Sequence, residues 1–271
     1  MTTSVTTSAL AAPGVRLYYE LRGDGPLVAL VGSPMHSAPF VPLAEHLAEQ
    51  YTVLTPDPRG HFGSRLDDPD TDATPEVRAD DLARILRHLD AGPATVFGSS
   101  GGAITALALL QAAPELVSTA IAHEPPLAEL LEDEREAQRR IRDDILTTFR
   151  GGDEVAAIRK FFAMTELSMP EDVFQQMFAH RDAAAIANDR FFYLHELEPT
   201  VSWRPDLDAL RGLDTPLIIG IGDTSAGMFC DRASRALATE LKIEPTFFPG
   251  GHGGFMENPP AFAARLREVI E

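Results

Sequence analysis

The sequence predicts an α/β protein in which a doubly wound, mainly parallel sheet carries an inserted helical cap. Short apolar runs alternate with helical patterns along most of the chain, and this alternation favours parallel strands joined by helical crossovers. Right-handed crossovers place helices on both faces of such a sheet. Between about residues 126 and 204, long charged helical patterns replace the alternation. We therefore expect a core domain of residues 1–125 and 205–271 and a cap of residues 126–204.

The first half of the chain supplies most of the expected sheet. After a polar tail, residues 15–21 alternate loosely and predict an edge strand that ends in a turn at residues 23–26. Residues 27–31 are a continuous apolar run, which is typical of a central strand covered on both faces. Further strands are predicted at residues 51–55, 94–97 and 116–122, and helices at residues 40–50, 75–89 and 103–112.

The second half of the chain begins with the predicted cap and returns to the strand pattern near its end. Residues 132–136 are highly charged and predict a solvated helix face. Large apolar side chains are frequent in the cap, namely Phe161, Phe162, Met164, Leu167, Met169, Phe174, Met177, Phe178, Phe191, Phe192, Tyr193 and Trp203. We expect most of them to pack within the cap, and we select Trp203, with Met35 from the core, as candidates for the wall of a substrate pocket. Strands are predicted at residues 216–221 and 246–248, and helices at residues 231–241 and 261–270.

The amino-acid composition disfavours several classes of binding partner. The chain of 271 residues has 41 acidic and 23 basic residues and a formal net charge of −18, which repels nucleic acid and anionic membrane surfaces. Cys230 is the only cysteine, which excludes an internal disulfide and a cysteine-rich metal site, and we expect it to be a packing residue. We expect neither a signal peptide nor a membrane-spanning run. The expected protein is cytoplasmic and acts on a small molecule, and the sequence is compatible with a homodimer.

A glycine-rich pentapeptide stands at the junction of a predicted strand and a predicted helix. It is formed by residues 98–102, Gly-Ser-Ser-Gly-Gly, with Ser100 at its centre. In a Gly-x-Ser-x-Gly motif at such a junction, the serine occupies a sharp, strained turn that exposes its Oγ above the sheet, and the flanking glycines relieve crowding. This placement makes Ser100 the candidate nucleophile.

A second segment points to the same arrangement. Residues 55–64, Thr-Pro-Asp-Pro-Arg-Gly-His-Phe-Gly-Ser, resemble the loop after the fourth strand in the α/β-hydrolase superfamily, whose nucleophile motif the pentapeptide also resembles. The resemblance covers roughly residues 15–125 and 205–271, and it implies the α/β-hydrolase fold. The segment between them resembles the family only as a cap and carries no motif that can be transferred.

His252 is the candidate for the base that a serine nucleophile needs at neutral pH. It follows the last predicted strand in a glycine-rich loop, residues 249–254, that resembles the catalytic-histidine loop of the family. Three other histidines are expected to be structural or to line the pocket: His36, His61 and His123. The remaining histidines lie in predicted helices and are expected to face solvent or to be satisfied locally: His46, His88, His180 and His195.

Two carboxylates compete for the role of the acid that orients His252. Many family members place an aspartate three residues after the glycine that ends the seventh strand, but counting from Gly222 gives Ser225, and Asp223 lies out of register. A second solution in the family takes the acid from the end of the sixth strand, where Glu124 stands. This placement resembles that of zearalenone-type lactonases, so we prefer Glu124 and keep Asp223 as the alternative acid.

Two backbone N–H donors are needed to hold the oxyanion of a tetrahedral intermediate. The resemblance implies that one is the amide of Gly101, which follows the nucleophile, and that the other comes from the loop after the third strand. The usual His-Gly-x of that loop is Val-Gly-Ser at residues 31–33 here, which points to the amide of Ser33. No metal or organic cofactor is implied.

Together these residues predict a serine hydrolase that cleaves a small carboxylic ester or lactone through an acyl-enzyme intermediate. A carbon–carbon bond hydrolase, a peroxidase-like enzyme and a biosynthetic tailoring enzyme or cyclase of the same fold are also compatible with Ser100, His252 and an acid. A serine nucleophile argues against epoxide hydrolases and haloalkane dehalogenases, which use an aspartate. A non-catalytic receptor for a small ligand is the alternative from a different class.

Overall fold

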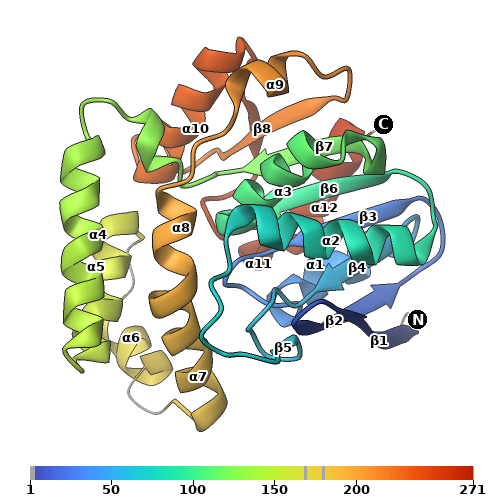
Figure 1. The fold of residues 1–271 in the computed structure, drawn as a ribbon. Helices are drawn as coiled ribbons and strands as arrows, with labels where there is room; N and C mark the ends of the chain where they lie inside the picture. The colour runs from blue at the N-terminus through green and yellow to red at the C-terminus, as the bar shows by residue number, and fades with distance from the viewer. Residues whose placement is uncertain (1–3, 168–169, 179–180, 271) are drawn as a thin grey trace.

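One mixed sheet forms the centre of the structure (Figure 1). The computed structural model describes residues 4–167, 170–178 and 181–270, so Met169 and His180 lie outside the described part. Within these ranges the strands are β1 (Val5–Ala12), β2 (Val15–Arg22), β3 (Leu27–Val31), β4 (Thr52–Pro56), β5 (Arg65–Leu66), β6 (Ala94–Ser99), β7 (Val117–His123), β8 (Leu217–Gly222) and β9 (Thr246–Phe248). Their order in the sheet is β1-β2-β4-β3-β6-β7-β8-β9, and β5 pairs with β2.

The strands from β4 to β9 in this order run parallel, as predicted. The pairs β3–β4, β3–β6, β6–β7, β7–β8 and β8–β9 are all parallel, whereas β2 pairs antiparallel with β1, β4 and β5. Parallel strands bring their carboxyl ends to one edge of the sheet, where ligands of open α/β sheets bind. Ser99 of β6 and His123 of β7 are register partners at that edge. The residues that directly follow these two strands are therefore neighbours.

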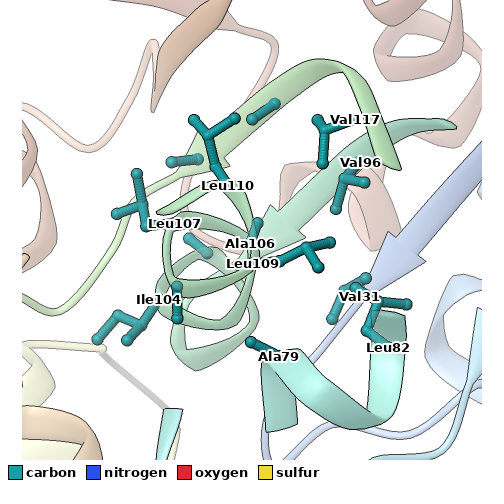
Figure 2. Close-up of a cluster of buried hydrophobic side chains, with 14 of the residues drawn as sticks. Val31, Ala79, Leu82, Val96, Ile104, Ala106, Leu107, Leu109, Leu110 and Val117 are labelled. Atoms are coloured by element: carbon teal, nitrogen blue, oxygen red, sulfur yellow. The ribbon is translucent and has the colours of Figure 1, made fainter. Parts of the chain in front are cut away.

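Helices cover both faces of the sheet, and the apolar run of β3 shows why. Leu27, Ala29 and Val31 pack into a cluster with α2 (Pro75–Leu89) and α3 (Gly101–Ala112). Val28 and Leu30 point to the other face, against α1 (Val41–Leu47) and α12 (Pro259–Ile270). Figure 2 shows side chains of α3 surrounded by residues of β3, β6, β7 and α2. A strand buried on both faces has no polar face, which explains its continuous apolar sequence.

The N-terminal edge of the sheet differs from the prediction. Residues 15–21 were expected to form an edge strand after a polar tail, but Val5–Ala12 forms β1 and pairs with β2 over its whole length, so β2 is internal. The residues of β1 are exposed or only partly buried. Its sequence therefore lacks the alternation of apolar and polar residues that marks a strand with one buried face, although its threonines and valine favour extended backbone.

The part of the chain between β7 and residue 201 is largely helical, and it lies beyond the carboxyl ends of the strands (Figure 1). Its helices are α4 (Arg135–Arg150), α5 (Glu154–Thr165), α6 (Glu171–Phe178), α7 (Ala183–Phe191) and α8 (Leu197–Val201). A π-helical turn, η4 (Phe192–Glu196), joins α7 to α8. Several of the predicted apolar residues, including Met164, Phe174, Phe192 and Tyr193, pack together as a separate cluster within this segment.

The remaining elements connect the sheet to its covering helices. They are the 3-10 turns η1 (Ala38–Phe40), η2 (Pro114–Leu116) and η3 (Ala128–Leu130), and the helices α9 (Leu207–Arg211), α10 (Phe229–Leu241) and α11 (Gly254–Glu257). α10 packs on the same face as α2 and α3 through Ala233 and Leu237. None of the described helices combines the length and the apolar character needed to cross a membrane.

Candidate active site

Ser100 occupies a sharp turn between β6 and α3. Its backbone φ is 58° and its ψ is −125°, a conformation that residues other than glycine rarely adopt. Two glycines make the turn sterically feasible, because a Cβ on Gly98 would lie 2.2 Å from the carbonyl oxygen of Gly102, and a Cβ on Gly102 would lie 2.0 Å from that of Val31. The backbone N–H of Ser100 donates to the His123 carbonyl oxygen at 3.0 Å. The fold thus holds the Ser100 side chain at the carboxyl edge of the sheet.

Glu124 follows β7 and lies beside this turn. Its backbone φ is 51°, and its N–H donates to the carbonyl oxygen of Gly220 in β8 at 3.0 Å. The carboxylate is 1% exposed; Oε2 lies 2.7 Å from Nδ1 of His252, and Oε1 accepts the N–H of Gly222 at 2.9 Å. Burial alone would raise the pKa of Glu124, but the hydrogen bond to His252 and the other contacts lower it to about 2. The group is therefore an ionised carboxylate held in one orientation.

Asp223, the alternative acid, lies near the same loop but contacts a different atom. Its Oδ1 accepts the backbone N–H of Gly250 at 2.9 Å, a bond between exposed groups. Its own N–H donates to the carbonyl oxygen of Phe248. The structure brings Glu124, and not Asp223, into hydrogen-bond contact with His252. Through its hydrogen bond with Gly250, Asp223 instead connects the end of β8 to the loop that carries His252.

His252 stands in the loop between β9 and α11, and its side chain is 16% exposed. Burial favours the neutral ring, but contacts with Cys230 and with the Glu124 carboxylate outweigh it and raise the pKa of His252 above its ordinary value. Because Nδ1 faces Glu124, Nε2 is the nitrogen left for a nucleophile. Within the described residues, the side chains of Ser100 and His252 are not joined by a hydrogen bond. Catalytic hydrogen bonds are often long or poorly aligned before substrate binds.

Ser33 and Gly101, the two residues predicted to supply oxyanion donors, lie against one another. A Cβ placed on Gly101 would be 2.6 Å from the carbonyl oxygen of Ser33 and 2.9 Å from its Oγ. Gly101 begins α3, where the first backbone N–H groups have no partner inside the helix. Ser33 is 4% exposed, and its hydroxyl donates to the carboxylate of Glu196 from η4.

The two candidates for the pocket wall lie in different surroundings. Met35 is partly buried and packs against the cluster under α1 and α12. Trp203 is 8% exposed and belongs to the cluster under α2 and α3, and its indole N–H donates to Oε1 of Glu76 at 2.7 Å. The contacts of Trp203 are thus those of a packed core residue with its polar atom satisfied.

Of the three histidines expected to be structural or to line the pocket, His61 and His123 are buried, whereas His36 is partly exposed. His123 is completely buried and packs against Phe97, Phe248 and Phe262, and burial lowers its pKa to about 4. His36 stacks on Phe62, with ring centroids 3.6 Å apart. Nε2 of His61 donates to Oε2 of Glu196 at 2.5 Å. His123 is therefore neutral near pH 7, although it adjoins Glu124.

Two residues at the site were not predicted from the sequence. Cys230, interpreted as a packing residue, is 5% exposed and is also among the groups that raise the pKa of His252. Glu196, in a predicted helical region, is fully buried against Ser33 and His61. Neither residue stands in a motif, and both positions follow from how α10 and η4 pack on the core. Among the described residues, no group of three His, Cys, Asp or Glu side chains is arranged to hold a metal ion.

Comparisons with known proteins agree with this geometry. The model of the alpha/beta hydrolase family matches residues 27–265. The chain is 32% identical to an uncharacterized hydrolase, YraK, of Bacillus subtilis (strain 168), over 99% of this chain and 97% of that protein. It is 27% identical to a zearalenone hydrolase of Bionectria ochroleuca, over 98% of each chain.

Solved structures show the same fold. A thermophilic esterase from Thermogutta terrifontis superposes with a TM-score of 0.66 at 24% identity, over 100% of this chain and 98% of that one. The family model spans the sheet from β3 to β9, the helical segment between β7 and β8, and the loop of His252. The chain therefore belongs to the alpha/beta hydrolase family and is a hydrolase.

Proposed function

We propose that this hydrolase cleaves a small carboxylic ester or lactone, with Ser100 as the nucleophile, His252 as the base and Glu124 as the acid that orients the base. One observation carries the proposal: the buried Glu124 carboxylate lies 2.7 Å from Nδ1 of His252, beside the strained turn of Ser100. A carboxylate in this place fixes the tautomer and orientation of the imidazole and stabilises the imidazolium that forms on proton transfer.

In the first half of the proposed reaction, Ser100 Oγ attacks the carbonyl carbon and its proton passes to Nε2 of His252. The carbonyl oxygen becomes an oxyanion, to which the amides of Ser33 and Gly101 donate. The bond from carbon to the leaving oxygen then breaks, and that oxygen takes the proton from His252. An ester releases its alcohol at this point, whereas a lactone keeps the new hydroxyl on the acyl chain.

In the second half, water attacks the acyl-enzyme carbonyl and transfers a proton to His252. Collapse of this second tetrahedral intermediate releases the carboxylic acid, and the proton returns from His252 to Ser100 Oγ. The cycle uses one water and restores every protein group. The low pKa of Glu124 suits this role, because an ionised carboxylate supports the imidazolium in both halves.

The choice of ester or lactone has two supports. The first is that the alignment with the zearalenone hydrolase, at 27% identity, covers 98% of this chain. Glu124 also stands at the end of the strand before the inserted helices, a placement that resembles zearalenone-type lactonases, whereas Ser225 occupies the place of the more common aspartate. Ser225 is fully buried, and its side chain is among the groups that lower the pKa of the Glu124 carboxylate.

The experiment that tests this function is labelling of the purified protein with a fluorophosphonate, followed by a substrate screen. We expect a single labelled site at Ser100, and loss of labelling in Ser100→Ala. The screen compares p-nitrophenyl esters of increasing chain length with aliphatic and macrocyclic lactones. Wild-type protein that stays unlabelled under conditions that label ordinary serine hydrolases, and that hydrolyses none of these compounds, would refute the proposal.

A further inference from the structure

A buried carboxylate from the helical cap reaches into the core beside the active site. Glu196 is the last residue of η4 and is completely buried. Its Oε1 accepts the hydroxyl of Ser33, and its Oε2 lies 2.5 Å from Nε2 of His61. Nη1 of Arg78 lies 3.5 Å from Oε1. Three polar groups from the core thus surround one side chain from the cap.

These three partners come from different parts of the core. Ser33 follows β3, His61 follows β4, and Arg78 belongs to α2. Burial alone would raise the pKa of Glu196, but His61 and Arg78 hold it below its ordinary value, so the carboxylate is ionised. A buried charge is tolerated only where its partners are well placed, and this requirement fixes the positions of all three groups relative to the cap.

The network also reaches the helix that follows the nucleophile. Nε of Arg78 donates to Oγ1 of Thr105 at 3.0 Å, and this hydroxyl donates to the carbonyl oxygen of Gly101 at 3.2 Å. Nη1 of Arg78 donates to Oγ1 of Thr200 in α8 at 2.9 Å. Both residues that carry the proposed oxyanion donors, Ser33 and Gly101, are therefore linked to the cap through side chains.

The loop of Ser33 needs such a restraint. A cavity of about 30 Å³ lies beside it, with Gly32, Arg78 and Thr105 among the lining residues, so close packing does not hold the loop on that side. The next anchor along the loop is the N–H of Ser37, which donates to Oδ1 of Asp57 at 2.9 Å. Between β3 and that anchor, the described residues show one side-chain hydrogen bond, from the hydroxyl of Ser33 to Glu196, and it helps to fix the orientation of the Ser33 peptide.

We propose that Glu196 is a positioning residue of the oxyanion site, which holds the backbone amide of Ser33 beside that of Gly101 by accepting the hydroxyl of Ser33. Glu196 touches no reacting atom, and its effect passes through Ser33. The proposal rests on the proposed function, since it assigns the Ser33 amide to the oxyanion. Short π turns within helices are frequent at functional sites, and η4 places Glu196 in this position.

The test is a double-mutant cycle between Ser33→Ala and Glu196→Gln. Ser33→Ala keeps the amide but removes the hydroxyl that Glu196 holds. Glu196→Gln leaves one acceptor oxygen to serve both Ser33 and His61. We expect each variant to lower kcat, measured per titrated active site, about tenfold and to leave KM within about twofold of the wild-type value. Deletion of an oxyanion donor lowers kcat about a hundredfold or more, and a donor that is only displaced should cause a part of that loss. The double variant is expected to be no slower than Ser33→Ala.

A control variant separates this effect from a general loss of stability. Glu198→Gln makes the same change two residues further along, where the side chain is 53% exposed and accepts from Ser202. We expect it to keep wild-type kcat. Amide hydrogen exchange in peptides that cover residues 32–37 is expected to be faster in Glu196→Gln than in the wild type, and unchanged in Glu198→Gln.

Two results would overturn the positioning role. One is a Glu196→Gln variant that lowers kcat by the same factor in the wild-type and Ser33→Ala backgrounds, which would show that Glu196 acts without Ser33. The other is unchanged exchange of residues 32–37 in Glu196→Gln. If Glu196→Gln does not fold, wild-type kcat in Ser33→Ala refutes the proposal. Failure of the proposed function is distinct, because it is detected in the wild type, and the exchange measurement needs no activity.

Discussion

Oε2 of Glu124 lies 2.7 Å from Nδ1 of His252, although the two residues are 128 positions apart in the chain. The sheet creates this contact, since β7 pairs with β8 and β8 pairs with β9. Glu124 directly follows β7, and His252 lies in the loop after β9. The N–H of Gly222, at the end of the intervening β8, holds the second oxygen of the carboxylate. The proposed acid and the proposed base are thus joined across an intervening strand.

The choice of acid is the first prediction. If Glu124 orients His252 as proposed, Glu124→Gln is expected to lower kcat by about 10³-fold to 10⁴-fold, in the range seen when the orienting acid of a serine triad is made neutral. Asp223→Asn is the matched control, and it is expected to stay within about fivefold of the wild type. Steady-state kinetics on one p-nitrophenyl ester measures both. Collapse of activity in Asp223→Asn, with Glu124→Gln near wild type, would reverse the assignment.

The second prediction concerns activity as a function of pH. In the proposed mechanism His252 must be neutral to accept the Ser100 proton. Its pKa is raised above 6.5 because the effects of Cys230 and Glu124 outweigh burial. The acidic limb of kcat/KM is therefore expected above pH 6.5, with activity rising as the ring loses its proton. Cys230→Ala removes one of these effects and should move the limb to lower pH. A limb that stays in place or moves to higher pH would show that Cys230 does not act on the ring.

The third prediction is a loss of stability in acid. Glu124 has a folded pKa of about 2 against an ordinary value of 4.5, so its ionised form stabilises the fold above pH 4.5, and this contribution is lost as pH falls towards 2. The shift corresponds to about 3 kcal/mol. Denaturant unfolding between pH 6 and pH 2.5 should show a smaller decrease in the free energy of unfolding for Glu124→Gln than for the wild type. Equal decreases would contradict the shift.

The fourth prediction concerns the glycine after the nucleophile turn. A Cβ on Gly102 would lie 2.0 Å from the backbone oxygen of Val31, and backbone cannot rotate away as a side chain can. Gly102→Ala is expected to lower the free energy of unfolding by at least about 2 kcal/mol and to displace Ser100. Gly212→Ala is the control, because its nearest neighbours are 3.5 Å away. Gly102→Ala with wild-type stability and activity would mean that β3 and α3 can separate at no cost.

Much of the fold was predictable because its signals are local. The apolar run of β3 and the pattern of α2, which begins at Pro75, follow from burial and helix geometry within a few residues. β1 was missed for the same reason, since its residues are exposed or partly buried and form a strand only through their pairing with β2. A strand that gains its order from a neighbour leaves little pattern in its own sequence.

By itself, the sequence determined the α/β fold class, the strained turn of Ser100 and the two carboxylates that could serve His252, because each depends on residues close together in the chain. Only the tertiary structure decided which carboxylate contacts His252, since the answer depends on the order of β7, β8 and β9 in the sheet. It also placed Cys230 against His252 and Glu196 against Ser33. The physical reason is that such contacts join side chains from separate elements, and their geometry is fixed by packing rather than by local spacing.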